Sequence, residues 1–256
     1  MRILPKALMT VLLLTVGCGS GSGQGKDGGV GSGSWLPLKV GNRWTYQVTD
    51  VDGTVTAKVQ GVTAEQAVGG DGDSKDMTAF KLVTGNKFND PNGDISFQAL
   101  VDDRVVRFRE LSINGASGAV KKEEYFGAPW KLRVDTAAAH TDLGANWPES
   151  YPSFVVDKPK STTTTSDGGA TVVDAGAAAD GGLVTTTSQI TDVWSVTAVD
   201  EPVTVPAGTF KALVVRRMAD SGRGTDKSFW FVRGVGKVKE TGVGEQTEEL
   251  SSYTLP

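Results

Sequence analysis

The sequence has very little of what metal and redox sites need. Its 256 residues include one cysteine and one histidine. A single cysteine excludes an intramolecular disulfide and a cysteine-cluster metal site. A single histidine excludes multi-histidine zinc sites and the iron site built from two histidines and a carboxylate. We therefore expect neither a metal nor another cofactor.

Excess positive charge and the common catalytic motifs are also missing. The 26 Lys and Arg face 30 Asp and Glu, a formal net charge of −4, so electrostatics give no reason to expect nucleic acid as a partner. The sequence contains no G-x-S-x-G, P-loop, H-E-x-x-H or C-x-x-C motif. Residues 23–28 spell G-x-G-x-x-G, but no strand precedes them and no helix follows, so they do not predict a dinucleotide site.

No apolar run of the sequence is long enough to cross a membrane as a helix. The longest, residues 7–16, follows the positively charged Arg2 and Lys6. Ten helical residues measure about 15 Å, half of the about 30 Å of a bilayer's hydrocarbon core. Residues 1–17 are therefore predicted to be an export signal.

The end of this signal, residues 14–18 (LTVGC), resembles the lipobox of bacterial lipoproteins. The resemblance implies that Cys18 becomes the first residue of the mature chain and carries a diacylglycerol thioether, usually with an acyl chain such as palmitate on its amino group. Such chains anchor a protein stably to a membrane. In that family a Gly at position 19, rather than Asp, implies the outer membrane. The alternative is an ordinary signal peptide cut near residues 19–23, with Cys18 incidental.

Two stretches lack the apolar side chains that a core needs. Residues 18–34 are rich in Gly and Ser and predict a disordered tether between the lipid and a folded domain. Residues 160–182 consist almost entirely of Thr, Gly, Ala, Asp and Ser, which predicts a low-complexity loop. Because the strand signal at 151–156 is too short to complete a separate domain, residues 35–256 are expected to form a single β domain. Two domains divided at this loop are the alternative.

Strand signals dominate from Trp35 onward, and helix signals almost vanish. β-rich runs recur about every ten residues with Gly, Asn and Asp between them, and Asp52-Gly53 is a typical hairpin turn. The helix-friendly pieces 135–140 and 175–180 are too short to be stable alone. The pattern predicts an all-β fold, an antiparallel meander that forms a curved sheet, a partly open barrel or a sandwich. After the first hairpin, the predicted strands are 77–84, 95–101, 104–111, 119–126, 130–134, 151–156, 183–199, 210–218, 227–233, 237–243 and 245–253.

The C-terminal strands are apolar on both faces, as at 212–215 and 229–232. Such strands belong either to a sandwich interior or to a curved sheet that lines a cavity. We favour the curved sheet or partly open barrel. The candidate ligand-lining residues are Trp194, Phe210, Leu213, Phe229 and Phe231.

Acidic residues occur in pairs and turns. Neighbouring carboxylates at 102–103, 123–124 and 248–249 would point to opposite faces of a strand, so we interpret them as turn or solvent-face charges rather than a glycosidase pair. Residues 90–94 (DPNGD) have oxygen spacing suited to calcium, but the following residues lack the Gly and Glu of an EF-hand loop. They are interpreted as a polar turn.

Two further features leave alternatives open. Arg107 and Arg109, close to Arg104, are expected to share one strand face opposite Val106, either solvated or in contact with anionic headgroups or polysaccharide. His140 lies in a polar stretch and would be catalytic only with a nucleophile nearby. Solvation of His140 is the simpler interpretation.

Three segments resemble a loosely characterised group of bacterial lipoproteins with an antiparallel β domain. They are 36–46 (LPLKVGNRWTY), 205–210 (VPAGTF) and 229–239 (FWFVRGVGKVK). These motifs carry turns and strands but no catalytic group. More distantly, an anchored antiparallel sheet with apolar strands resembles the LolA/LolB-type half-barrel carriers, which hold acyl chains against a sheet covered by helices. This sequence departs from those carriers because it predicts no covering helix.

Three functions remain after these exclusions. The first is a lipid-anchored, non-enzymatic β domain of the cell envelope that binds or scaffolds an envelope protein. The second is a carrier of lipid or another hydrophobic ligand on a concave apolar sheet face. The third is an unrecognised hydrolase around His140.

Overall fold

The computed structural model describes residues 33–157, 184–219 and 225–256. The predicted export signal, Cys18, nearly all of the predicted tether and the low-complexity loop lie outside the described residues. Their assignments therefore stay predictions.

The described residues confirm the all-β antiparallel prediction. They contain thirteen strands and a single one-turn 3-10 helix, η1 (Ala138–His140). No described helix is long and apolar enough to span a bilayer. The strands are β1 (Arg43–Thr49), β2 (Val55–Ala67), β3 (Thr78–Gly85), β4 (Asp94–Val101), β5 (Arg104–Ile113), β6 (Val120–Phe126), β7 (Lys131–Asp135), β8 (Asn146–Asp157), β9 (Val184–Val205), β10 (Gly208–Ala219), β11 (Lys227–Val232), β12 (Gly236–Gly242) and β13 (Thr247–Thr254).

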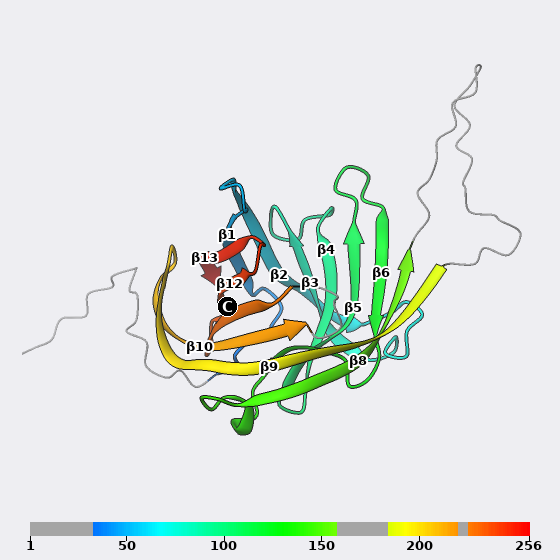
Figure 1. The fold of residues 1–256 in the computed structure, drawn as a ribbon. Coiled ribbons are helices and arrows are strands. Elements are labelled where there is room, and N and C mark those ends of the chain that lie inside the picture. Colours follow the sequence, from blue (N-terminus) through cyan, green and yellow to red (C-terminus); the bar gives the residue numbers. More distant parts are fainter. Residues whose placement is uncertain (1–32, 158–183, 220–224) are drawn as a thin grey trace, which may run out of the picture.

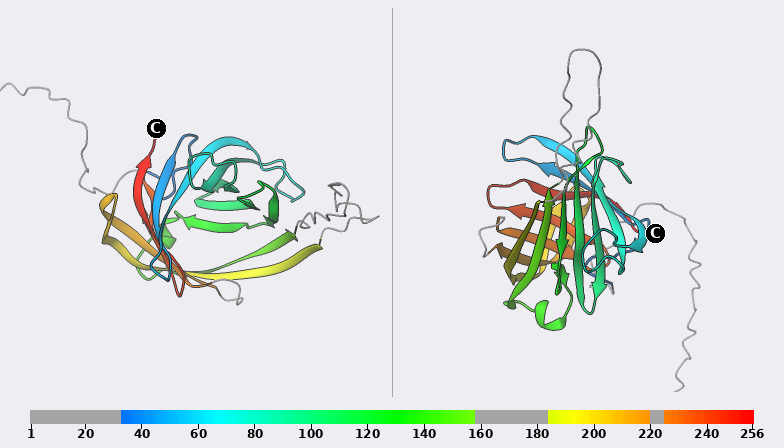
Figure 2. Two further views of the ribbon diagram at one scale, coloured as in Figure 1. Left: turned by 90° about the horizontal axis from the view of Figure 1, so that it is seen from above. Right: turned by 90° about the vertical axis from the view of Figure 1, so that its right-hand side faces the viewer.

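The sheet closes on itself. Its strand order is β4-β3-β2-β1-β13-β12-β11-β10-β9-β8-β6-β5-β7, and a further pairing between β4 and β5 completes a 12-strand barrel with β7 as an extra strand. The predicted antiparallel meander thus curves into a barrel, and this barrel is closed rather than partly open. Figures 1 and 2 show it from three directions, with the long β9 (yellow) running beside β8.

β6 and β7 share one edge of β5. β6 pairs with the half of β5 from Arg109 to Ile113, and β7 pairs with the half from Arg104 to Arg107. β8 then pairs with β6 through Ser153–Asp157. This arrangement gives β7 a place in the barrel wall beside β5, where its side chains can face the interior.

The first hairpin forms where the sequence predicted it. The backbone N–H of Asp50 donates to the carbonyl oxygen of Thr54 at 2.9 Å, and Gly53 adopts φ +85°. A positive φ is strained for residues with a Cβ, so glycine suits this turn. Asp102 and Asp103 form a two-residue turn that joins β4 to β5, in agreement with the interpretation of this pair as turn charges.

Aromatic side chains occur in each of the four buried hydrophobic clusters of the described residues, and two of these clusters bear on the predicted lining residues. One contains Trp35 together with Trp194, and Trp194 stacks on Phe229 with ring centroids 5.8 Å apart. The other contains Trp44 and Tyr46 from β1, which are 0% and 1% exposed. Only part of the barrel interior is apolar, however. The remaining, polar part forms the candidate site.

Candidate ligand-binding site

A cavity of about 180 Å³ lies inside the barrel and is lined mostly by charged and polar side chains. Its lining residues come from seven strands on opposite walls of the barrel. They include Lys58 and Gln60 from β2, Ser96 from β4, Arg107 from β5 and Glu240 from β12. Residues on opposite walls can line one space only in the interior. An eight-stranded barrel is just filled by its own side chains or holds one small ligand, so twelve strands leave room for such a cavity.

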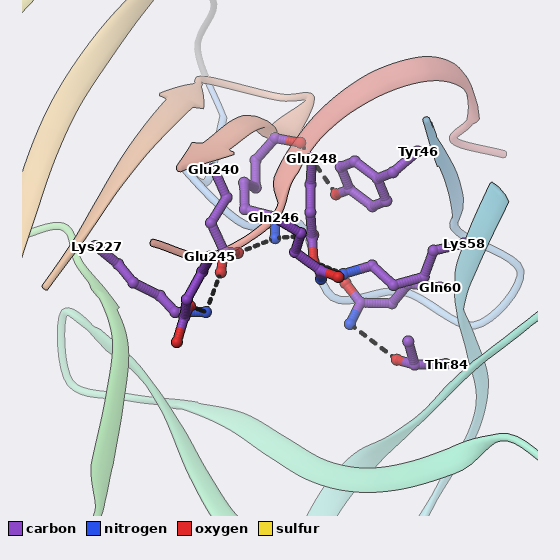
Figure 3. Close-up of polar contacts among 10 residues, drawn as sticks. Tyr46, Lys58, Gln60, Thr84, Lys227, Glu240, Glu245, Gln246 and Glu248 are labelled. Carbon is purple, nitrogen blue, oxygen red and sulfur yellow. Dashed lines mark hydrogen bonds and ion pairs between the residues drawn. The ribbon is translucent and has the colours of Figure 1, made fainter. Parts of the chain in front are cut away.

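One wall of the cavity is an ion-pair network centred on Lys237. Its ammonium forms ion pairs with Glu240 and, at 2.8 Å, with Glu248. Figure 3 labels both carboxylates together with Lys58, which also binds Glu248. The hydroxyl of Tyr46 donates to the Lys237 carbonyl oxygen at 3.0 Å. Burial lowers the pKa of Lys237, but the two carboxylates outweigh it and raise the pKa above its usual value. Burial and the charge of Lys237 lower the pKa of Lys58 to about 8.

A β-bulge in β12 builds this network. Trp230 pairs with Lys239 and Phe231 pairs with Lys237, so Val238 is an extra residue between two pairs. In a regular strand, residues three positions apart point to opposite faces. The bulge reverses this parity and places Lys237 and Glu240 on the same inner face.

A second bulge separates two arginines that the sequence predicted on one face. Phe97 pairs with Arg109 and Gln98 pairs with Arg107, which leaves Phe108 unpaired in β5. Arg107 therefore faces the cavity and forms an ion pair with Glu110. The prediction of a shared, solvated face is wrong, because the extra residue inverts the alternation.

The outward arginine binds a loop rather than solvent. Arg109 forms an ion pair with Glu123 and donates from Nη1 to the carbonyl oxygen of Val68 at 2.8 Å. The Tyr125 hydroxyl accepts a hydrogen bond from the backbone N–H of Asp71 at 2.9 Å. Together these contacts hold the loop between β2 and β3 against the outside of the barrel.

A third bulge presents Arg133 to the cavity. Val105 pairs with Val134 and Val106 pairs with Leu132, so Arg133 is the extra residue of β7. Its side chain lines the cavity, and its buried Nε has no hydrogen-bond partner. Among the described residues, none forms a hydrogen bond or an ion pair with this guanidinium.

Burial shifts the pKa values of the two β7 cations. Burial and the neighbouring Arg107 lower the pKa of Lys131 to about 8 and that of Arg133 to about 10. Burial raises the pKa of Glu110, but Arg107, Lys131 and Arg133 outweigh it and bring the value down to about 2. Glu124 also acts on Lys131 from β6. The cations at this corner of the cavity therefore disfavour one another's charged forms and favour the ionised form of Glu110.

A second, less polar cleft of about 290 Å³ lies outside the barrel wall. It lies between the β2–β3 loop and strands β5, β6 and β8, and Phe108 and Phe154 are among its lining residues. Gly70 allows the loop to approach closely, since a Cβ there would lie 2.3 Å from the Tyr125 hydroxyl oxygen. This cleft was not predicted from the sequence, because its parts are distant along the chain.

The predicted apolar lining residues do not line an open groove. Trp194, Leu213, Phe229 and Phe231 lie together in one core cluster and are 1–3% exposed. Phe210 is partly buried and packs in the other cluster, near Tyr253. The sequence thus located core residues, whereas the cavity is lined by charged residues that it did not single out as a site.

In the pairs 123–124 and 248–249 the two carboxylates point to opposite faces, as predicted, but Glu123 and Glu248 are not solvent-face charges. Glu123 and Glu248 are 4% and 3% exposed. Glu123 contacts Arg109, while its neighbour Glu124 accepts a hydrogen bond from Ser153 at 2.6 Å. The interpretation as exposed charges is wrong for these two because each is itself buried and forms an ion pair, Glu123 with Arg109 and Glu248 with Lys237.

The acidic turn at 90–94 serves the backbone, in agreement with the prediction of a polar turn. The carboxylate of Asp90 accepts hydrogen bonds from the backbone N–H groups of Asn86 and Asn92 at 2.9 and 3.0 Å. Asp94 accepts from the N–H of Ile113 at 2.8 Å. No group of acidic residues and His that could hold a metal occurs in the described parts of the chain.

His140 makes two contacts, neither of them with a nucleophile. Its Nδ1 lies 2.7 Å from Oδ2 of Asp135, and its ring stacks on Trp147 with centroids 4.0 Å apart. Within residues 33–157, 184–219 and 225–256, no hydroxyl is hydrogen-bonded to this imidazole. The contacts orient the side chain against the barrel without forming a Ser-His-Asp arrangement.

The comparisons with known proteins concern the fold. No family model and no curated protein matches the chain. A Bacteroides fragilis structure, described as a candidate exported protein with a YmcC-like fold, aligns with 88% of this chain and 100% of its own at TM-score 0.47 and 11% identity. A Parabacteroides distasonis structure, described as a candidate lipoprotein, aligns with 90% and 100% at TM-score 0.39 and 12% identity. Neither structure is described as a LolA/LolB-type carrier. The closed sheet of this chain also differs from the half-barrel of the LolA/LolB-type carriers.

Proposed function

We propose that the protein is a lipid-anchored, non-enzymatic protein of the bacterial cell envelope, attached to the outer membrane through Cys18, whose barrel binds a small polar ligand. The lipobox-like segment at 14–18 supports the anchor. The observation that carries the binding function is the charged cavity inside the closed barrel.

The nature of the cavity favours a polar ligand over an acyl chain. Charged side chains reach the cavity from several walls, and those of Lys58 and Glu110 keep 25% and 30% of their surface accessible. Inserting a hydrocarbon chain would remove water from these charges without providing hydrogen bonds, which is costly. The aromatic residues that could have received a lipid are already packed against one another.

A binding role also fits the chemistry of the interior better than hydrolysis does. The inward carboxylates Glu110, Glu240 and Glu248 each form an ion pair with a buried cation. Opposing charges keep a carboxylate ionised, whereas a general acid needs a raised pKa. The Asp135–His140 pair has no hydroxyl partner in the described residues.

The outer cleft supports a second candidate function, binding of an apolar ligand outside the barrel. Val68, Phe108 and Phe154 give it an apolar lining and its volume, about 290 Å³, exceeds that of the inner cavity. The sequence predicted a hydrophobic ligand on the concave face of the sheet, and this second candidate function places such a ligand on the outer wall instead.

Ligand titrations of the full-length chain in detergent test which site is used. Calorimetry with inorganic phosphate, succinate, erythritol and a neutral monoacylglycerol should give binding of at least one of the three polar compounds. A Thr84→Trp variant, which fills the inner cavity, should lose that binding, whereas Val55→Trp at an exposed position should keep it. Binding of the monoacylglycerol alone would contradict the polar function and favour the outer cleft.

The anchor has its own test. Mass spectrometry of the mature chain should find lipid on Cys18 and no residues before it. A Cys18→Ser variant should move from the membrane fraction to the soluble fraction of the envelope. An unmodified Cys18 thiol on the mature chain would refute the anchor.

A further inference from the structure

Arg133 is a partly buried cation whose Nε is fully buried and which has no ion-pair partner among the described residues. Buried charges in proteins are normally paired, because an isolated charge loses its hydration without compensation. The Arg133 side chain lines the inner cavity, its Nε is sealed from solvent, and no described residue bonds to its guanidinium. The other inward arginine of this wall, Arg107, has Glu110 as its ion-pair partner. The difference marks Arg133 as available to a ligand.

The carboxylates around Arg133 are already engaged. Glu110 and Glu240 both act on it electrostatically. Glu110 is bound by Arg107, and Glu240 is bound by Lys237 and, at 2.9 Å, by Lys227. Neither carboxylate therefore neutralises Arg133 through a direct contact.

A second cation without an ion pair lies on the same strand. Lys131 contacts the ring of Phe126 at 4.8 Å from its centroid, and among the described residues it has no ion-pair partner. Charged neighbours that act on it are Arg107, Glu110, Glu124, Arg133 and Asp192. Two unpaired cations thus lie two residues apart in β7, at the bulge that turns Arg133 inward.

We infer that the inner cavity binds a small molecule through an oxyanion group, a carboxylate or a phosphate, with Arg133 as its principal contact and Lys131 as a second positive charge. This inference rests on the proposed binding function and specifies the ligand. The planar guanidinium matches the two oxygens of a carboxylate or phosphate, which an ammonium cannot do. Gln60, Thr84 and Ser96 add neutral polar groups to the lining.

The size of the cavity limits the ligand. Its volume of about 180 Å³ is below the about 300–1,000 Å³ of sites for drug-sized ligands. A phosphate or a short organic acid fits this space, and a phospholipid with its acyl chains does not. The oxyanion is therefore expected to belong to a small soluble compound.

The test titrates inorganic phosphate and succinate, each separately, into the full-length chain and three variants in phosphate-free buffer, with erythritol as the neutral probe. Arg133→Met removes the guanidinium and keeps an unbranched side chain. Arg133→Lys keeps a charge but not the planar fork. Arg216→Met is the matched control, since Arg216 lies on β10, does not line the cavity, is 46% exposed, and is paired with Asp226.

The expected result is binding of phosphate, succinate or both, at least tenfold weaker in Arg133→Met and unchanged in Arg216→Met. Arg133→Lys should lie between the wild type and Arg133→Met. Without ligand, Arg133→Met should unfold at the same temperature as the wild type or higher, since the charge it removes has no partner.

The opposite outcomes separate two failures. Erythritol binding without anion binding, or anion binding that Arg133→Met leaves unchanged, would overturn the oxyanion site while the polar binding function stands. Binding of none of the three probes would overturn the binding function itself. If Arg133→Met does not fold, Arg133→Lys decides, and wild-type affinity in that variant would overturn the role of the guanidinium.

Discussion

Replacing Lys237 with methionine tests the buried network in the barrel wall. The side chain of Lys237 is 11% exposed and bridges Glu240 and Glu248, whose side chains are 11% and 4% exposed. Removing one partner of a buried ion pair costs about 3–5 kcal/mol, because the other charge stays buried without compensation. Lys227 remains as the cationic partner of Glu240, and Lys58 remains as that of Glu248. We therefore expect a loss at the lower end, about 3 kcal/mol.

The assay is thermal and urea unfolding of the variant beside its control. A loss of about 3 kcal/mol corresponds to a decrease in Tm of about 6–12 °C for a domain of this size. Lys239→Met is the control, since Lys239 lies two residues along β12 on the outer face and pairs with Glu249 at 2.8 Å, where both side chains are about a quarter exposed. Such a surface pair contributes about 0–1 kcal/mol.

The pH dependence gives a second readout of the same change. In the wild type, the pKa values of Glu240 and Glu248 lie below 4.5, since Lys237 outweighs the effect of burial. Their contribution to stability is thus present above about pH 4.5 and is lost as the pH falls below it. Without Lys237 both pKa values rise, so lowering the pH from 7 toward 4.5 should narrow the stability gap between variant and wild type. Equal losses in Lys237→Met and Lys239→Met, or a gap independent of pH, would refute the buried network.

Two further predictions concern the aromatic core and the cavity. Trp194→Ala should lower the free energy of unfolding in urea by about 3–5 kcal/mol, because Trp194 is 2% exposed and stacks on Phe229. Val199→Ala, at a 45% exposed position on the same strand, should change that free energy by less than about 0.5 kcal/mol. Similar losses of stability in the two variants would contradict the packing of Trp194. The affinity for succinate, which stays fully ionised over this range, should fall as the pH rises through about 8, where Lys131 and the cavity-lining Lys58 lose their protons, while Arg133 stays charged up to about 10. Calorimetry that finds constant affinity between pH 7 and 9 would exclude both lysines from the site.

β-rich runs separated by turn residues were enough to locate the strands, although β8 and β9 extend beyond their predicted bounds of 151–156 and 183–199. Runs such as 95–101 and 104–111 correspond closely to β4 and β5, and the hairpin at Asp52-Gly53 formed as expected. These features depend on neighbours in the chain, which local pattern describes well. Closure of the sheet depends on the pairing of the first strand, β1, with the last, β13, which are distant along the chain, so it does not follow from the composition of a single strand.

The site could not be predicted because β-bulges decide which charges point inward. A strand that alternates regularly would place Arg107 beside Arg109 and Lys237 opposite Glu240. Each bulge adds one residue and inverts the parity, so Arg107 joins Glu110 and Lys237 joins Glu240 in the interior. The three-residue spacing of opposite charges in both strands is a signal that could have suggested the bulges.

Anomalous diffraction from crystals of the full-length chain soaked in selenate tests the central claim most directly. Selenate is an oxyanion of about the size of phosphate, and selenium reveals its own position. We expect selenium in the inner cavity, with an oxygen about 2.7–3.2 Å from a guanidinium nitrogen of Arg133. Selenate bound only at exposed cations such as Arg216, with Arg133 bonded to another side chain, would contradict the oxyanion site.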